Sequence, residues 1–66
     1  MIKLTRLNGT EFVLNCELIE VVEQTPDTVI STTNGKKFVV VENIDEIVKK
    51  VLHYKRSISL LNRINQ

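Results

Sequence analysis

The sequence of 66 residues has a single cysteine, a single proline, two glycines and no tryptophan. One cysteine cannot form an internal disulfide, and we expect Cys16 to be a small buried apolar side chain in a protein of a reducing compartment. No apolar run approaches the roughly 18 residues of a membrane-spanning helix, and no secretory leader is recognisable. We therefore expect a cytoplasmic protein without a membrane span.

Residue patterns for catalysis or metal binding are equally scarce. His53 is the only histidine, and with one cysteine it cannot build the usual zinc constellations. The serines have no acid–histidine pair beside them in the sequence. Both glycines follow an asparagine, as in hairpin turns, rather than forming a phosphate-binding loop. The sequence therefore predicts no enzymatic activity, no catalytic residue, no metal and no cofactor.

The net charge of +1 conceals an uneven distribution along the chain. Residues 11–46 contain all eight acidic residues and two lysines, a net charge of −6, whereas residues 47–66 contain five basic residues and no acid, a net charge of +5. Lys3 and Arg6 supply the remaining +2. A basic end of this kind is typical of a solvated helix face that complements the helix dipole. The alternative is contact with an acidic protein, nucleic acid or anionic lipid.

A first hairpin is predicted by alternating residues on both sides of Asn8-Gly9, a dipeptide that strongly favours a two-residue turn. With such a turn, a favourable arginine–glutamate pair lies across the two strands, which supports this register. The cross-strand pairs expected in this hairpin are Arg6–Glu11, Thr5–Phe12 and Leu4–Val13.

A second hairpin is predicted around Asn34-Gly35, between strands over 28–33 and 36–42. Residues 18–24 indicate one more strand, which follows a bend at 15–17 and precedes the turn "TPDT" (25–28). The cross-strand pairs expected in the second hairpin are Thr28–Val41, Val29–Val40, Ile30–Val39 and Ser31–Phe38.

After the strands the apolar spacing changes to that of a helix. Asn43 with Glu46 three residues later is typical of a helix N-cap. We expect a helix over about 44–58, with 59–66 as a tail or an extension that overhangs the strands. One apolar seam with alternating spacings of three and four comprises Ile44, Ile47, Val51, Tyr54, Ile58 and Leu61.

These elements predict a single small domain over 1–66 of the α+β class, mainly β. Five short antiparallel strands (2–42) form hairpins in a small sheet or barrel, and one C-terminal helix follows. In the registers above each hairpin is apolar on both faces, but one helix covers only one face. The other face then closes into a barrel or meets another copy, and both can occur together. The apolar seam of the overhanging helix favours a partner independently, so we expect a homo-oligomer. The expected contacts between copies are Phe38, Val40, Tyr54, Ile58 and Leu61.

Binding to nucleic acid is an alternative function for a β-rich module with a basic helix. Residues 14–42 resemble the second half of the LytTR DNA-binding domain, although the arginine-and-histidine strand that precedes it there is missing. The strand region is acidic, and three aromatic residues make a base-stacking platform improbable. Nucleic acid is therefore the less favoured partner.

Residues 1–56 resemble the FlbD/SwrD family of small flagellar and swarming-motility proteins. The residues that carry the resemblance are "LTRLNG" (4–9), "LN" with "LIE" (14–20), "TPDT" (25–28) and "NGKK" (34–37), in order and at the family's spacing. Thr32 and Val41 depart from the family pattern, which favours a larger apolar residue and a polar residue there. The resemblance implies a cytoplasmic protein that supports motor performance or swarming near the stator region, at the inner face of the membrane. It implies no reaction and no cofactor.

The candidate interaction residues are basic. Thr5 and Arg6 are the motif residues that turn geometry explains least, and the basic helix end adds further positive charge. We expect this surface to meet an acidic loop of a motor or stator-associated protein. A nucleic-acid-binding regulator of flagellar genes and an oligomeric scaffold remain as alternatives. The residues of the expected surface are Thr5, Arg6, Lys49, Lys50, Lys55 and Arg56.

Overall fold

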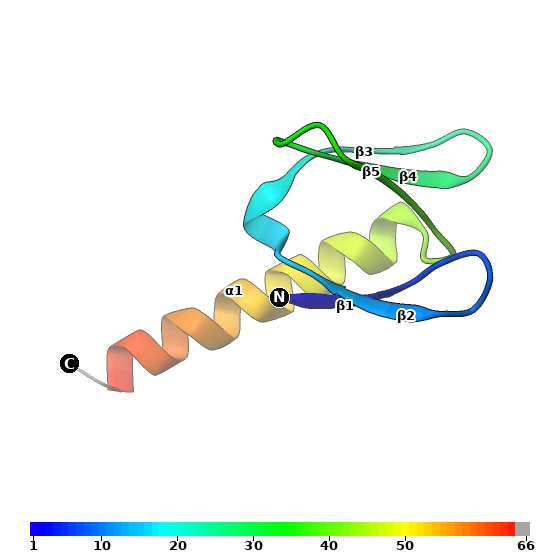
Figure 1. Cartoon of the computed structure of the whole chain (residues 1–66). Helices are drawn as coiled ribbons and strands as arrows, with labels where there is room; N and C mark the ends of the chain where they lie inside the picture. The colour runs from blue at the N-terminus through cyan, green and yellow to red at the C-terminus, as the bar shows by residue number, and fades with distance from the viewer. Residues whose placement is uncertain (65–66) are drawn as a thin grey trace.

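The computed structural model describes the backbone of residues 1–64 and the side chains of residues 1–58. Five strands are followed by one long helix, as the sequence predicts (Figure 1). The elements are β1 (Ile2–Thr5), β2 (Glu11–Leu14), the 3₁₀-helix η1 (Cys16–Leu18), β3 (Ile19–Gln24), β4 (Thr28–Thr32), β5 (Lys37–Val40) and α1 (Ile44–Ile64).

The strands form two antiparallel sheets, β1-β2 and β3-β4-β5. A single antiparallel bridge between Arg6 and Val40 joins the end of β1 to the end of β5. Next to it, the N–H of Val41 donates to the carbonyl of Thr5 at 2.9 Å. Figure 1 shows the two sheets facing each other beside the first half of α1. Within residues 1–64 the strands do not close into a barrel, because β2 and β3 remain as free edges.

The turn of the first hairpin is one residue longer than predicted. The N–H of Arg6 donates to the carbonyl of Thr10 at 2.8 Å, and that of Gly9 donates to the carbonyl of Arg6 at 2.9 Å. Residues 7–9 therefore form a three-residue loop, in which Gly9 adopts a φ of +89°. The predicted register is wrong by one residue. The observed pairs are Ile2–Leu14, Lys3–Val13, Leu4–Phe12 and Thr5–Glu11.

The second hairpin repeats this geometry. The N–H of Thr32 donates to the carbonyl of Lys36 at 2.8 Å, and the N–H of Gly35 donates to that of Thr32 at 3.0 Å. Gly35 has a φ of +84°, so residues 33–35 form the loop. Here too the predicted register is wrong by one residue. The observed pairs are Thr28–Val40, Val29–Val39, Ile30–Phe38 and Ser31–Lys37.

The corrected registers change which side chains share a face, since a slip of one residue moves a strand's side chains to the opposite face of its partner. In β1-β2, all four inward residues are apolar, whereas the outward ones are mostly polar. The prediction that both faces of this hairpin are apolar is therefore wrong. The β3-β4-β5 sheet keeps three outward valines, of which Val21 and Val39 are exposed and Val29 is half-buried.

Helix α1 begins at the predicted N-cap. The side chain of Asn43 accepts a hydrogen bond from the N–H of Glu46 at 2.8 Å, and the side chain of Gln24 accepts one from the N–H of Ile44 at 3.1 Å. Both bonds satisfy donors that a helix start leaves free. At about 1.5 Å per residue, 21 residues extend for about 31 Å. The second half of α1 therefore projects beyond both sheets (Figure 1).

The core lies between the two sheets and the first half of α1. Cys16 belongs to it, as predicted, and Ile47 is fully buried, alone among the side chains of residues 44–58 of the helix. Val51 and Tyr54 pack against this core from the next turns of α1. The buried apolar residues are Ile2, Leu4, Leu14, Cys16, Ile30, Val40 and Ile47.

Candidate interaction site

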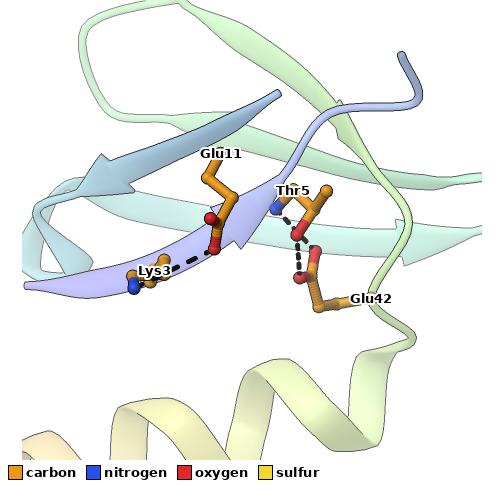
Figure 2. Close-up of polar contacts among 4 residues, drawn as sticks. All are labelled: Lys3, Thr5, Glu11 and Glu42. Carbon is orange, nitrogen blue, oxygen red and sulfur yellow. Dashed lines mark hydrogen bonds and ion pairs between the residues drawn. The ribbon is translucent and has the colours of Figure 1, made fainter. Parts of the chain in front are cut away.

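Thr5 and Glu42 connect the end of β1 to the segment that leads into α1 (Figure 2). The backbone N–H of Thr5 donates to one carboxylate oxygen of Glu42 at 3.0 Å, and its hydroxyl donates to the other at 2.9 Å. Glu42 is 8% exposed, so both contacts are largely shielded from water. Thr5 was predicted as an interaction residue, and the structure uses its side chain within the fold.

The pKa of Glu42 reflects this environment. Burial acts to raise it, because a low-dielectric surrounding disfavours the charged form. The hydrogen bonds from the backbone and the hydroxyl of Thr5 and from the backbone N–H of Glu42, together with the positive charge of Lys50, outweigh burial. The pKa of Glu42 is consequently lower than the ordinary glutamate value, and the residue is an anion at neutral pH.

Arg6 lies over two aromatic rings. Its guanidinium carbon is 4.4 Å from the ring centroid of Phe12 and 5.7 Å from that of Phe38. The two rings stack with centroids 5.3 Å apart and planes at 27°. Leu4 pairs with Phe12 and Ile30 pairs with Phe38, so each ring extends from the core side of its sheet. The aromatic pair thus spans the two sheets, and Arg6 covers it.

The backbone of Arg6 is held on both sides. Its N–H and carbonyl both form hydrogen bonds of the first hairpin loop, and it also forms the bridge to Val40. The side chain remains exposed, and no ion pair to Arg6 occurs among the described side chains. The planar guanidinium is therefore fixed by stacking while its N–H donors stay available.

The basic residues of α1 lie on different sides of the helix. Lys49 and Arg56 are exposed and have no ion-pair partner in the part of the chain whose side chains are described. Lys55 forms an ion pair with Glu17 of η1 at 3.8 Å. Lys50 is half-buried and faces β1, where its charge acts on Glu42. The basic side chains between residues 49 and 56 therefore do not form one continuous face.

A groove of about 290 Å³ separates β1 from the middle of α1. Lys3 borders it and also forms an ion pair of 3.9 Å with Glu11 (Figure 2). A second groove of about 280 Å³, between β3 and α1, is lined mainly by apolar side chains. The residues that line the first groove are Met1, Ile2, Lys3, Lys50, His53, Tyr54 and Ser57.

The structure brings together only some of the predicted interaction residues. Thr5 and Lys50 both act on Glu42, whereas Arg6 makes no described contact with Lys55 or Arg56. Glu42 itself was missed, because a glutamate at the end of an apolar strand gives no local signal of burial.

The predicted contacts between copies have different surroundings. Val40 is 1% exposed in the core, and Phe38 and Tyr54 pack against that core. Ile58 is exposed, and Leu61 lies outside the residues whose side chains are described.

Two further properties concern the described residues as a whole. Within them, no group of three or more His, Cys, Asp and Glu side chains is placed to hold a metal ion. No helix in the described part of the chain has the length and apolar character needed to cross a membrane.

Comparison with known proteins places the chain in a family. The family model of FlbD, described as flagellar and swarming motility proteins, matches residues 1–59. No curated protein and no solved structure matches the chain. The match covers most of the 66 residues and agrees with the resemblance carried by the four motifs. The chain belongs to the FlbD family of flagellar and swarming motility proteins.

Proposed function

We propose that this protein is a non-enzymatic accessory of the flagellum that supports motor function or swarming by binding another protein through Arg6. The observation that carries the proposal is the exposed guanidinium held over Phe12 and Phe38. An arginine immobilised by stacking loses less side-chain entropy on binding than a free one, and it presents a planar fork that matches a carboxylate. Arginine is enriched among the hot-spot residues that supply most of the binding energy of protein interfaces.

The partner in this proposal is a motor or stator-associated protein with an acidic loop, met in the cytoplasm at the inner face of the membrane. Lys49 and Arg56 support this assignment, since both are exposed and their charges attract an acidic surface. Charge attraction of this type accelerates association more than it strengthens the complex. Arg6 is therefore expected to contribute most to affinity, and the helix cations to the rate of binding.

The first test replaces Arg6 in a flagellated bacterium whose swarming requires this protein. Arg6→Met keeps an apolar stem over the two rings but removes the charge and the donors. We expect swarming to fall sharply in this variant and to recover only in part in Arg6→Lys, because lysine lacks the fork. Lys36→Met, at another exposed hairpin position, is the matched control. Normal swarming of a stable Arg6→Met protein would refute the proposal.

A second test concerns the helix and the nucleic-acid alternative. Reversing the charges of Lys55 and Arg56 in a stably folded variant is expected to slow swarming.

Phe12 and Phe38 are half-buried beneath Arg6, which leaves little aromatic surface for stacking on bases. Specific, salt-dependent binding to flagellar promoter DNA or transcript in a gel-shift assay would instead favour a regulator of gene expression.

A further inference from the structure

The groove between β1 and α1 gathers positive charge from two elements. Lys3 comes from β1 and Lys50 comes from α1, where the imidazole of His53 lies three residues further along the helix. Residues 50, 53 and 57 lie three or four positions apart and so share one side of α1. Apolar surface from Met1 and Ile2, and the ring of Tyr54, complete the wall. Cationic groups therefore border a partly apolar hollow that can take one or two side chains.

Most of this charge is only weakly neutralised within the fold. The Lys3–Glu11 pair is 3.9 Å long, with side chains 68% and 64% exposed, so water screens it strongly. Lys50 acts on the buried anion Glu42 but forms no ion pair within 4.0 Å to any side chain of residues 1–58. The hydroxyl of Ser57 is occupied, because it donates to the carbonyl of His53 at 3.0 Å. Lys3 and Lys50 are thus the principal donors open to a ligand.

We propose that this groove is a second docking site, which binds a short acidic segment of a partner protein through Lys3, Lys50 and His53. A carboxylate of the segment lies between the two lysines, and a neighbouring apolar side chain packs on Met1 and Tyr54. The inference rests on the proposed function, since it names the chemistry of a partner segment. The groove is a second site in addition to Arg6, and its residues come from both β1 and α1.

The composition of the groove favours a peptide over a phosphate or a lipid surface. Phosphate sites are usually built from main-chain N–H groups at a helix N-terminus or from arginine forks. This groove lies along the middle of α1 and has point charges beside apolar surface. A membrane-binding face needs clustered basic residues around a broad apolar surface. The lysines here instead border a hollow of about 290 Å³.

The test is an NMR titration of the full-length protein labelled with ¹⁵N. The probe is a peptide of two Asp-Glu-Leu repeats with blocked ends, and its amide analogue of two Asn-Gln-Leu repeats is the peptide control. Inorganic phosphate and vesicles of phosphatidylglycerol with phosphatidylcholine are titrated separately. We expect the acidic peptide alone to shift the amide signals of residues 2–4, 50, 53, 54 and 57 in a saturable manner.

Single substitutions distinguish peptide binding in the groove from non-specific attraction of the acidic peptide to any basic residue. Lys50→Gln is expected to weaken peptide binding about fivefold, in line with loss of one partly exposed charge pair, whereas Lys36→Gln, at an exposed hairpin position, leaves it nearly unchanged. Because Lys50 also acts on Glu42, Lys3→Gln provides an independent variant of the same site. Equal effects of Lys36→Gln and Lys50→Gln, or signal shifts spread over all basic residues, would overturn the proposal. Site-specific shifts with phosphate or vesicles, without peptide binding, would also overturn it.

Swarming assays distinguish this inference from the proposed function. If Lys3→Gln combined with Lys50→Gln abolishes peptide binding and impairs swarming, the groove acts in motility as proposed. If the double variant swarms normally while Arg6→Met does not, the groove inference fails and the role of Arg6 stands. If the double variant does not swarm and Arg6→Met swarms normally, the docking groove is supported and the function proposed for Arg6 is refuted.

Discussion

At the scale of single residues, Glu42 is held in place by burial and by hydrogen bonds to a distant segment. It is nearly buried, it is 37 positions from Thr5 in the sequence, and it accepts two hydrogen bonds from that residue. A buried carboxylate without donors is strongly destabilising, so these bonds tie β1 to the start of α1. Thr5 and Glu42 therefore have a role in the fold, and Arg6 has a side chain that the fold positions but leaves exposed.

Replacing Thr5 tests the link between β1 and α1. Thr5→Val preserves the shape of the side chain and the backbone donor but removes the hydroxyl donor to Glu42. We expect the free energy of unfolding in urea to fall by about 1–2 kcal/mol, because a charged group loses one buried partner. Thr10→Val, at an exposed position, should change stability little. Equal stability of the two variants would contradict the contribution assigned to the hydroxyl.

The low pKa of Glu42 predicts a pH dependence of stability. Because the folded pKa is below that of the unfolded chain, the ionised carboxylate stabilises the fold above about pH 4.3, the usual glutamate value. This contribution decreases as the pH falls through the lower folded pKa. The stability difference between the wild type and Glu42→Gln should therefore shrink on acidification, as measured by urea unfolding at several pH values. Glu20→Gln, at an exposed position, is the control, and a difference independent of pH would be inconsistent with this account.

At the scale of elements, the two hairpin loops show where sequence reasoning succeeded and failed. The strands flank Asn8-Gly9 and Asn34-Gly35 as predicted, but both loops have three residues rather than two. Asn-Gly suits either loop, since both place glycine where φ is positive. The two loop lengths differ in which side chains they bury. Only the three-residue loop places the apolar residues Ile2, Leu4, Phe12 and Leu14 on one face of the hairpin.

Thr32 illustrates the same point at the second loop. A larger apolar residue is expected there from the family pattern, yet Thr32 is buried and its hydroxyl bonds to both the loop and the returning strand. It accepts from the N–H of Lys36 at 3.1 Å and donates to the side chain of Asn34. The threonine thus replaces apolar packing with hydrogen bonds that close the loop.

The glycines of these loops provide a test at this scale. Gly35→Ala places a β-carbon on a residue with a φ of +84°, although no atom beyond the two adjacent residues lies within 4 Å of that β-carbon. The expected loss of about 1 kcal/mol is therefore a backbone effect and not a steric clash. Gly35→Asn should cost less, because asparagine tolerates this conformation. Thermal unfolding of the two variants measures the difference, and an equal loss would contradict a purely backbone cause.

At the scale of the whole molecule, the long helix determines the shape. The radius of gyration is 13.0 Å, whereas a compact chain of this length has one of about 11 Å. The projecting half of α1 accounts for the excess (Figure 1). Val48, Leu52 and Ile58 are exposed on this helix, and Val21 and Val39 on the outer face of a sheet. The hairpin registers on which the prediction of a homo-oligomer was based are wrong. The exposed apolar side chains of α1 and of the outer sheet face are a different argument for the same prediction.

Truncation after Arg56 tests the role of the projecting helix. Among the helix side chains that the structure describes, those packed on the core are Ile47, Val51 and Tyr54, so we expect the shortened chain to keep nearly the same unfolding temperature. We expect the full chain to self-associate and the shortened chain to be a monomer in light scattering after size exclusion. Multimers of both would assign assembly to the sheet face with Val21 and Val39. Monomers of both would refute self-association.

The order of the elements, the positions of the hairpins, the start of the helix and the family could all be predicted from the sequence. These follow from local properties: the turn preference of asparagine and glycine, the cap at Asn43 and the change of apolar spacing. The registers, the burial of Glu42, the stacking of Arg6 and the basic groove are seen only in the folded chain. Each of these depends on contacts between distant segments, and one added loop residue reverses which side chains face the core.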